Sequence, residues 1–128
     1  MSLPDKATVK NRILAALPDA EFAMLSKAMT PVELELGQTL HRHGDVIEHV
    51  YFVETGFISA LAVLSDGHPL EIGLIGAEGL AGFSVVLGGA TSYSETMCQT
   101  GGKAYRMQVG ALKDAFAQSP VLRDLLLR

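Results

Sequence analysis

Apolar residues recur at helical spacing near the start of the chain and lose that spacing after position 31. This periodicity predicts a helix over 11–17, ended by Pro18, and a second helix over 20–29 with Asp19 as its N-cap. From Val32 onward the apolar residues form short runs separated by turn residues, which is typical of strands. The chain is therefore expected to pass from helices into a β-structure near Val32.

Six short runs supply the expected strands of this β-structure. They cover 32–36, 50–53, 57–64, 70–75, 96–99 and 104–109. Asp66-Gly67 lies between two of the runs and predicts a hairpin. The regular spacing of turn glycines along the chain is typical of all-β sandwiches and barrels. The glycines are Gly37, Gly44, Gly56 and Gly67. The strand residues of the roll are expected to include Tyr51, Phe52, Val53, Leu61, Val63, Ile72 and Leu74.

The last part of the chain returns to helical spacing. A helix is expected over 110–118, and Ser119 followed by Pro120 predicts the N-terminus of another. The last helix carries an apolar stripe made of Val121, Leu122, Leu125 and Leu126. A helix of this length is marginal alone. The stripe is therefore expected either to pair with a second copy of the chain or to fold back onto the roll.

The composition agrees with one folded domain. A length of 128 residues fits a single domain, and 48% hydrophobic residues are enough for a sizeable core. The net charge of −4 is a poor match for nucleic acid. No apolar run is long enough to cross a membrane, no signal-peptide pattern opens the chain, and the single Cys98 excludes an internal disulfide. We therefore expect a cytoplasmic protein without a membrane partner.

His41-Arg42-His43 is a candidate metal site. Two imidazoles at i and i+2 on a strand share one face, which suits metal coordination. With Glu48 and Gly56 the segment resembles the first motif of the cupins, a metal-binding β-barrel family. The second cupin motif requires a further His followed by Asn, and the chain's one asparagine is Asn11. Two interpretations remain open. The segment is either a pair of partly exposed histidines before a turn, or part of a cupin-like metal-dependent enzyme that uses His41, His43 and Glu48.

Other enzyme signals are weak. No G-x-S-x-G elbow and no phosphate-binding loop occurs, and Cys98 is interpreted as a buried structural thiol. The glycine-rich stretch 76–89 is unusual and predicts a turn leading into a short helix. Such a turn is either an anion cradle or a means of tight chain crossing inside a small barrel. We therefore expect no catalytic residues.

The order of these elements resembles the cyclic-nucleotide-binding domain of the Crp/Fnr transcription regulators, from about Asn11 to Arg128. The segments that carry the resemblance are Leu36-Gly37-Gln38-Thr39-Leu40, Gly44-Asp45, His49-Val50-Tyr51-Phe52-Val53-Glu54-Thr55-Gly56-Phe57-Ile58 and Asp66-Gly67. The family implies a mainly β fold with flanking helices, a double-stranded β-helix of jelly-roll type. Residues 1–128 then form one sensor domain, with N-terminal helices over about 1–30, a β-roll over 31–109 and C-terminal helices over 110–128.

The resemblance also implies partners. Family members dimerise through a long helix that follows the roll, and they read DNA through a helix-turn-helix. We therefore expect a homodimer through the C-terminal helix, and DNA contact only through a domain outside these residues. The expected function is a non-catalytic effector-sensing and dimerisation domain of a bacterial regulator. The cupin-like enzyme is the alternative.

The ligand cassette departs from the family pattern. Members that bind cyclic AMP hold the ribose with a Gly-Glu pair and the phosphate with an Arg-Ser or Arg-Thr pair. These pairs fall on Ala81-Gly82 and near Ser92-Tyr93, so the carboxylate and the arginine are both missing. A buried phosphate would lack its charge-assisted contact, so we expect no tight binding of cyclic AMP or cyclic GMP and no cofactor or metal. Any other effector is expected at Gly79, Leu80, Ala81, Gly82, Phe83, Ser84, Ser92, Tyr93 and Ser94.

Overall fold

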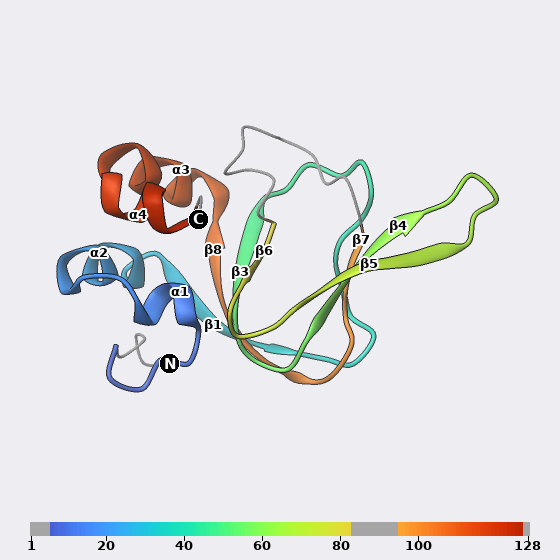
Figure 1. Ribbon diagram of the computed structural model, residues 1–128, viewed down its shortest axis with the longest axis horizontal. Coiled ribbons are helices and arrows are strands. Elements are labelled where there is room, and N and C mark those ends of the chain that lie inside the picture. The colour runs from blue at the N-terminus through green and yellow to red at the C-terminus, as the bar shows by residue number, and fades with distance from the viewer. Residues whose placement is uncertain (1–5, 83–94, 127–128) are drawn as a thin grey trace.

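The computed structural model describes residues 6–82 and 95–126, and these form two antiparallel sheets with helices at one side (Figure 1). The first sheet has the order β1-β8-β3-β6, and the second has the order β2-β7-β4-β5. The strands are β1 (Met29–Leu34), β2 (Thr39–His41), β3 (His49–Thr55), β4 (Ile58–Val63), β5 (Pro69–Ile75), β6 (Leu80–Ala81), β7 (Glu95–Cys98) and β8 (Gly102–Gln108). All seven residues expected in roll strands lie in β3, β4 or β5, so this expectation is confirmed.

The N-terminal helices are shorter than expected. Helix α1 (Arg12–Ala15) begins after Asn11, whose side chain accepts hydrogen bonds from the amides of Ile13 and Leu14. Helix α2 (Asp19–Ser26) has Pro18 as its N-cap, so the assignment of Asp19 to that position is wrong. Asp19 instead lies in the first turn, where a carboxylate is favoured by the helix dipole.

The second helix also ends earlier than its apolar pattern suggested. It ends at Ser26, and Met29 opens β1 instead of closing the helix. Met29 pairs with Met107 on β8 and is buried in the same cluster as Phe22 and Leu25. A residue that faces the same core from a strand or from a helix gives the same apolar signal, which explains the error.

Successive residues of β3 belong to two different hydrophobic clusters. On β3, Val50 and Phe52 face the helices, whereas Tyr51 and Val53 face the second sheet. The cluster under the helices contains Leu14, Leu17, Phe22, Leu25, Met29, Ile47, Val50, Phe52, Leu80, Met107, Leu112, Ala115, Leu122 and Leu126. The cluster between the sheets contains Leu34, Val53, Ile58, Ala81, Cys98 and Ala104. Cys98 is thus a buried structural residue, as expected, and burial raises the pKa of its thiol.

The C-terminal helices cover the outer face of the first sheet. Helix α3 (Val109–Gln118) follows β8 directly, and α4 (Pro120–Leu126) follows Ser119. The hydroxyl of Ser119 accepts a hydrogen bond from the amide of Leu122 at 3.1 Å, which confirms the expected cap. Leu122 and Leu126 are buried in the helical cluster, whereas Val121 is 46% exposed. Most of the apolar stripe therefore folds back onto the domain.

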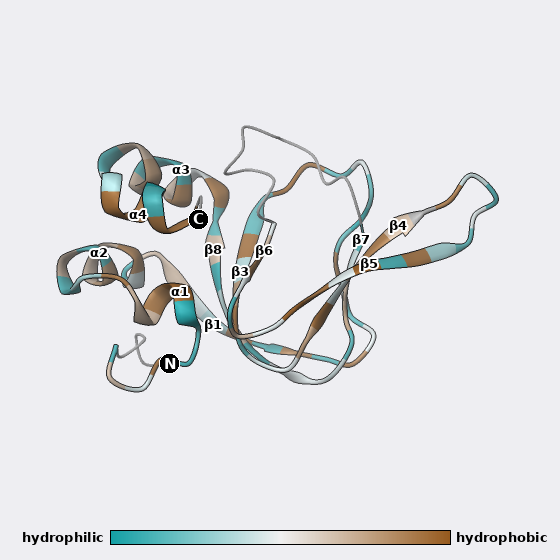
Figure 2. Cartoon of the chain, viewed as in Figure 1, coloured by the Kyte–Doolittle hydropathy of each residue, from teal (hydrophilic) through white to brown (hydrophobic). Residues whose placement is uncertain are grey.

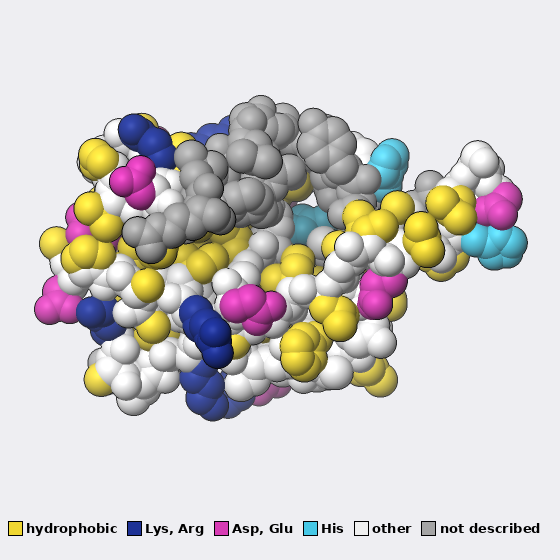
Figure 3. Space-filling model, viewed as in Figure 1, with side chains coloured by type: hydrophobic (Ala, Val, Ile, Leu, Met, Phe, Trp, Pro, Cys, Tyr) yellow, Lys and Arg dark blue, Asp and Glu magenta, His cyan; other side chains and the backbone are white. Residues whose placement is uncertain are grey.

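Strands β4 and β5 form a hairpin that projects from the roll (Figure 1). Its turn contains Gly67 with φ +89°, which explains why the Asp66-Gly67 signal was reliable. Three large apolar side chains on β5 are about half exposed, and hydrophobic residues run along the hairpin in Figures 2 and 3. They are Leu70, Ile72 and Leu74. None of the helices in the described ranges is long and apolar enough to cross a membrane.

Candidate functional site

The predicted ligand site lies at the end of β6. Of its nine residues, Gly79, Leu80, Ala81 and Gly82 are described; Phe83, Ser84, Ser92, Tyr93 and Ser94 lie outside the described residues, as does most of the expected short helix. Ala81 pairs with Tyr51 on β3 and packs between the sheets. Leu80 points to the opposite face and packs with the helices. The described part of the cassette therefore meets the roll interior through Ala81 and Gly82.

Gly82 occupies a position that only glycine fits without strain. Its φ is +94°, in the left-handed region. A Cβ there would lie 3.0 Å from Cγ1 of Val50 and 3.4 Å from Cε1 of His41. Both the backbone conformation and the close neighbours therefore disfavour any side chain here, including the carboxylate that nucleotide-binding members carry in this pair.

His41 anchors the neighbourhood of Gly82. Its Nε2 lies 2.8 Å from the carbonyl oxygen of His49, and its Nδ1 lies 2.9 Å from Oγ1 of Thr96. A carbonyl can only accept, so Nε2 carries the proton and Nδ1 of the neutral ring accepts from the Thr96 hydroxyl. Burial lowers the pKa of His41. The hydrogen bond to the His49 carbonyl raises this pKa by a smaller amount, and the charge of His49 lowers it. His41 is thus a neutral structural link between β2, β3 and β7.

These bonds bear on the alternative metal site. Both ring nitrogens of His41 are used by protein partners, and His43 and Glu48 are exposed. Within residues 6–82 and 95–126, no three His, Cys, Asp or Glu side chains are grouped as metal ligands would be. The described residues therefore do not assemble the cupin-like set of His41, His43 and Glu48.

Arg106 is the residue that the sequence reasoning missed. It lies on β8 between Thr30 of β1 and Tyr51 of β3, and Tyr51 in turn pairs with Ala81. Neighbouring strands lie about 4.8 Å apart, so Arg106 is two strand spacings, about 10 Å, from the start of the cassette. Burial raises the pKa of Tyr51. The charge of the Arg106 guanidinium and its hydrogen bond to the Tyr51 side chain lower this pKa by a smaller amount. A charged residue within the apolar run 104–109 was the available signal.

Two polar cavities flank Tyr51 and Arg106. One has a volume of about 320 Å³, and its lining includes His41, Asp45, Glu48 and Tyr51. The other has a volume of about 230 Å³ and reaches from Arg106 to the first turn of α3. His49 lines both cavities. The perturbed groups His41 and Tyr51 are also here, which marks this end of the roll as the candidate site.

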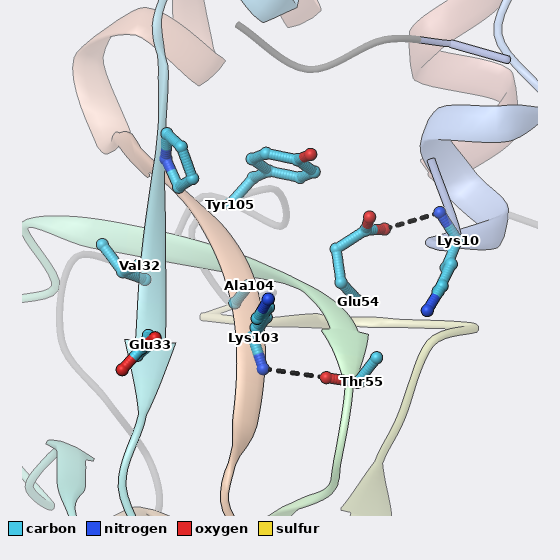
Figure 4. Close-up of a pocket in the computed structure, with 9 residues that line it drawn as sticks. Lys10, Val32, Glu33, Glu54, Thr55, Lys103, Ala104 and Tyr105 are labelled. Carbon is cyan, nitrogen blue, oxygen red and sulfur yellow. Dashed lines mark hydrogen bonds between the residues drawn. The ribbon is translucent and has the colours of Figure 1, made fainter. Parts of the chain in front are cut away.

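A larger groove of about 540 Å³ lies on the outer face of the first sheet (Figure 4). The segment before α1 forms one wall. The carboxylate of Glu54 holds this segment by accepting hydrogen bonds from the backbone amides of Lys10 at 2.8 Å and Asn11 at 2.5 Å. Lys103 and Tyr105 of β8 form part of the floor. Glu54 is thus occupied in holding the N-terminal segment, and none of the four predicted ligand residues that the structure describes lines this groove.

A family model described as "Cyclic nucleotide-binding domain" matches residues 31–119. The chain belongs to the cyclic nucleotide-binding domain family. The model covers the β-roll from Pro31 onward and all of α3, so the resemblance carried by the glycine and Gly-Asp motifs is confirmed for the domain, together with its jelly-roll-type fold. No curated protein sequence matches the chain significantly.

Solved structures of other proteins share this fold. The N-terminal domain of a transcriptional regulator from Streptomyces coelicolor is 26% identical, with a TM-score of 0.71 over 97% of this chain and 86% of that one. A guanosine-bound regulatory subunit of a cAMP-independent protein kinase A from Trypanosoma cruzi has a TM-score of 0.79 at 17% identity, over 92% of this chain and 41% of that one. The catabolite activator protein of Thermus thermophilus has a TM-score of 0.76 at 14% identity, over 90% and 54%. The chain thus spans about half or less of the last two proteins.

Proposed function

We propose that the chain is the effector-sensing and dimerisation domain of a bacterial Crp/Fnr-type transcription regulator, and that it performs no catalysis. Two similar structures support this function: the regulator domain from Streptomyces coelicolor and the catabolite activator protein from Thermus thermophilus. The family to which the chain belongs is one of regulatory binding domains. A regulator of this kind acts in the cytoplasm, where its DNA is.

The effector of this domain is a molecule other than cyclic AMP or cyclic GMP. The observation that carries this proposal is the backbone of Gly82, whose left-handed φ and close neighbours disfavour a ribose-binding carboxylate at this position. The effector contacts the cassette residues Gly79–Ser84 and Ser92–Ser94. Binding there changes how the roll packs against the helices that follow it.

The whole protein is a homodimer that pairs through its C-terminal helix. Leu122 and Leu126 already pack on the domain, so the pairing face is made by Val121 and by the residues that continue the helix. The apolar side chains exposed on β5 offer further surface to a second copy. Sedimentation of the full-length gene product should show a dimer, and a strict monomer at high concentration would contradict this assembly.

The direct test of the regulator function is DNA binding by the full-length product of the gene. Footprinting on the promoter regions beside that gene should reveal a protected site with two-fold symmetry, because a symmetric dimer reads two half-sites. The 128-residue chain alone, with its net charge of −4, is the control and should protect nothing. A full-length protein that protects no DNA under any effector condition would overturn the proposed function.

A further inference from the structure

The smaller of the two polar cavities is lined mainly by side chains that can donate a hydrogen bond. Four polar side chains contribute: the guanidinium of Arg106, the hydroxyl of Thr30, the imidazole of His49 and the amide of Gln108. Ala28 and Ala111 complete the lining. No carboxylate is among these residues; Asp45 and Glu48 line the neighbouring cavity instead.

Strand register brings these four polar residues to one face of the first sheet. Thr30 is paired with Arg106, and His49 is paired with Gln108. Side chains two residues apart on a strand share a face, so Arg106 and Gln108 point the same way. Tyr51 lies on this face as well, and it packs against the cluster between the sheets. The arrangement is therefore a consequence of the fold and is held by backbone pairing on three strands.

Arg106 is half-buried without a carboxylate partner among the described residues. Its described side-chain partner is the neutral hydroxyl of Tyr51. The undescribed stretch 83–94 contains no Asp or Glu, so the cassette cannot supply one either. A partly desolvated guanidinium that has no carboxylate partner among the described residues is best satisfied by an oxyanion, which it can bind through two parallel hydrogen bonds.

We propose that this cavity binds the carboxylate or phosphate group of a small effector, with Arg106 as the anion-binding residue. The inference rests on the proposed function, because it names the ligand class that the sensor recognises. The volume of about 230 Å³ is below the usual range for drug-sized ligands, about 300–1,000 Å³, so the group bound here is small. An acid of this kind needs no ribose-binding carboxylate at Gly82.

The position of the cavity links the anion to the C-terminal helices. Ala111 belongs to the first turns of α3, whereas Thr30, His49 and Arg106 belong to the sheet. An anion in the cavity contacts the sheet and α3 together, so it favours the arrangement in which both close around it. Helix α3 packs on α4, which leads toward the proposed dimer interface.

The test is a titration of the isotope-labelled chain by nuclear magnetic resonance, with inorganic phosphate and with acetate as separate probes and sodium chloride at equal ionic strength as the reference. Saturable shifts are expected for the amides of Thr30, His49, Arg106 and Ala111 with at least one probe. Comparison of the two oxyanions identifies which group is preferred. Absence of saturable shifts at these amides with both probes would overturn the proposal.

Three variants locate the binding residue. Arg106→Gln should weaken the preferred oxyanion about tenfold or more, since a charge-assisted hydrogen bond is lost. Arg12→Gln removes the same charge from the exposed face of α1 and should leave binding unchanged. Thr30→Val keeps the shape of the lining and should weaken binding less than Arg106→Gln does, which preserves a readout if the arginine variant folds poorly.

Equal effects of Arg106→Gln and Arg12→Gln would show general charge attraction and would also overturn the proposal. This titration is independent of DNA binding. If the full-length protein fails to bind DNA while the chain binds the oxyanion through Arg106, the regulator function is wrong and the anion site stands. If the full-length protein binds DNA and neither probe binds in the cavity, the anion site is wrong and the regulator function stands.

Discussion

The ring of His41 stands edge-on to the ring of Tyr51, with the ring centroids 5.7 Å apart and the ring planes at 64°. The two residues come from β2 and β3, which belong to different sheets. Burial favours the neutral form of each side chain, lowering the pKa of His41 and raising that of Tyr51. The pair therefore joins the two sheets at the candidate site without placing a charge there, and the cationic Arg106 lies opposite Tyr51 on that face.

The first prediction concerns the pH dependence of stability. Because the pKa of His41 is lower in the folded chain than its unfolded value of about 6.5, the unfolded chain binds the proton more readily. Its contribution to stability is complete above that pH and is lost as the pH falls toward the folded pKa. Urea unfolding should therefore show a falling free energy of unfolding below about pH 6.5.

The variant His41→Gln should flatten this dependence and cost about 1–3 kcal/mol at neutral pH through its disturbed buried hydrogen bonds. His43→Gln removes an exposed histidine two residues away and serves as the matched control. An unchanged pH slope in His41→Gln, or the same loss of slope in His43→Gln, would show that the buried imidazole does not govern the dependence.

The second prediction separates the two constraints on Gly82. Gly82→Ala should lower the free energy of unfolding by about 2–4 kcal/mol, because it adds both a strained φ and a methyl group against Val50 and His41. Gly37→Ala has a similar positive φ with open space around it, so it should cost only the backbone part, about 1–2 kcal/mol. Gly110→Ala in α3 should be neutral or slightly stabilising. Equal losses for Gly82→Ala and Gly37→Ala in urea unfolding would remove the close-approach argument.

The third prediction concerns Asn11, which is fully buried and joins α1 to the roll. Its Nδ2 donates to the carbonyl oxygens of Val53 and Gly79, each at 2.8 Å, and its Oδ1 caps α1. Asn11→Ala should cost about 2–4 kcal/mol, since the cap is lost and two carbonyls lose their donor. Thermal unfolding checks this against the exposed control Gln118→Ala; a shift in midpoint no larger than that of the control would contradict the role.

Local signals in the sequence predicted most of the architecture. The Asp66-Gly67 turn and the Ser119-Pro120 cap each act over a few neighbouring residues, so their meaning does not depend on the rest of the fold. The glycine and Gly-Asp spacing likewise led to the correct family. Two local signals competed at Pro18 and Asp19. The sequence assigned the N-cap of the second helix to Asp19, whereas the structure assigns it to Pro18.

The candidate site could be predicted only in part, because its residues meet through long-range pairing. Arg106 reaches Tyr51 and Thr30 through the pairing of β8 with β3 and β1, strands that are distant in the sequence. No local sequence pattern predicts the register of β8 against β1 and β3. His41 shows the same limit: its spacing with His43 suggested a metal, and the structure instead bonds it to Thr96 and His49. Polar partners of a buried group depend on the whole topology.

The conformation and close neighbours of Gly82 predict that this member of the family does not use cyclic AMP or cyclic GMP as its effector. Isothermal titration calorimetry of the chain with cyclic AMP and with cyclic GMP tests it most directly. Neither nucleotide should give saturable heat, and therefore neither should have a dissociation constant tighter than about 1 mM. A micromolar dissociation constant for cyclic AMP or cyclic GMP would contradict it.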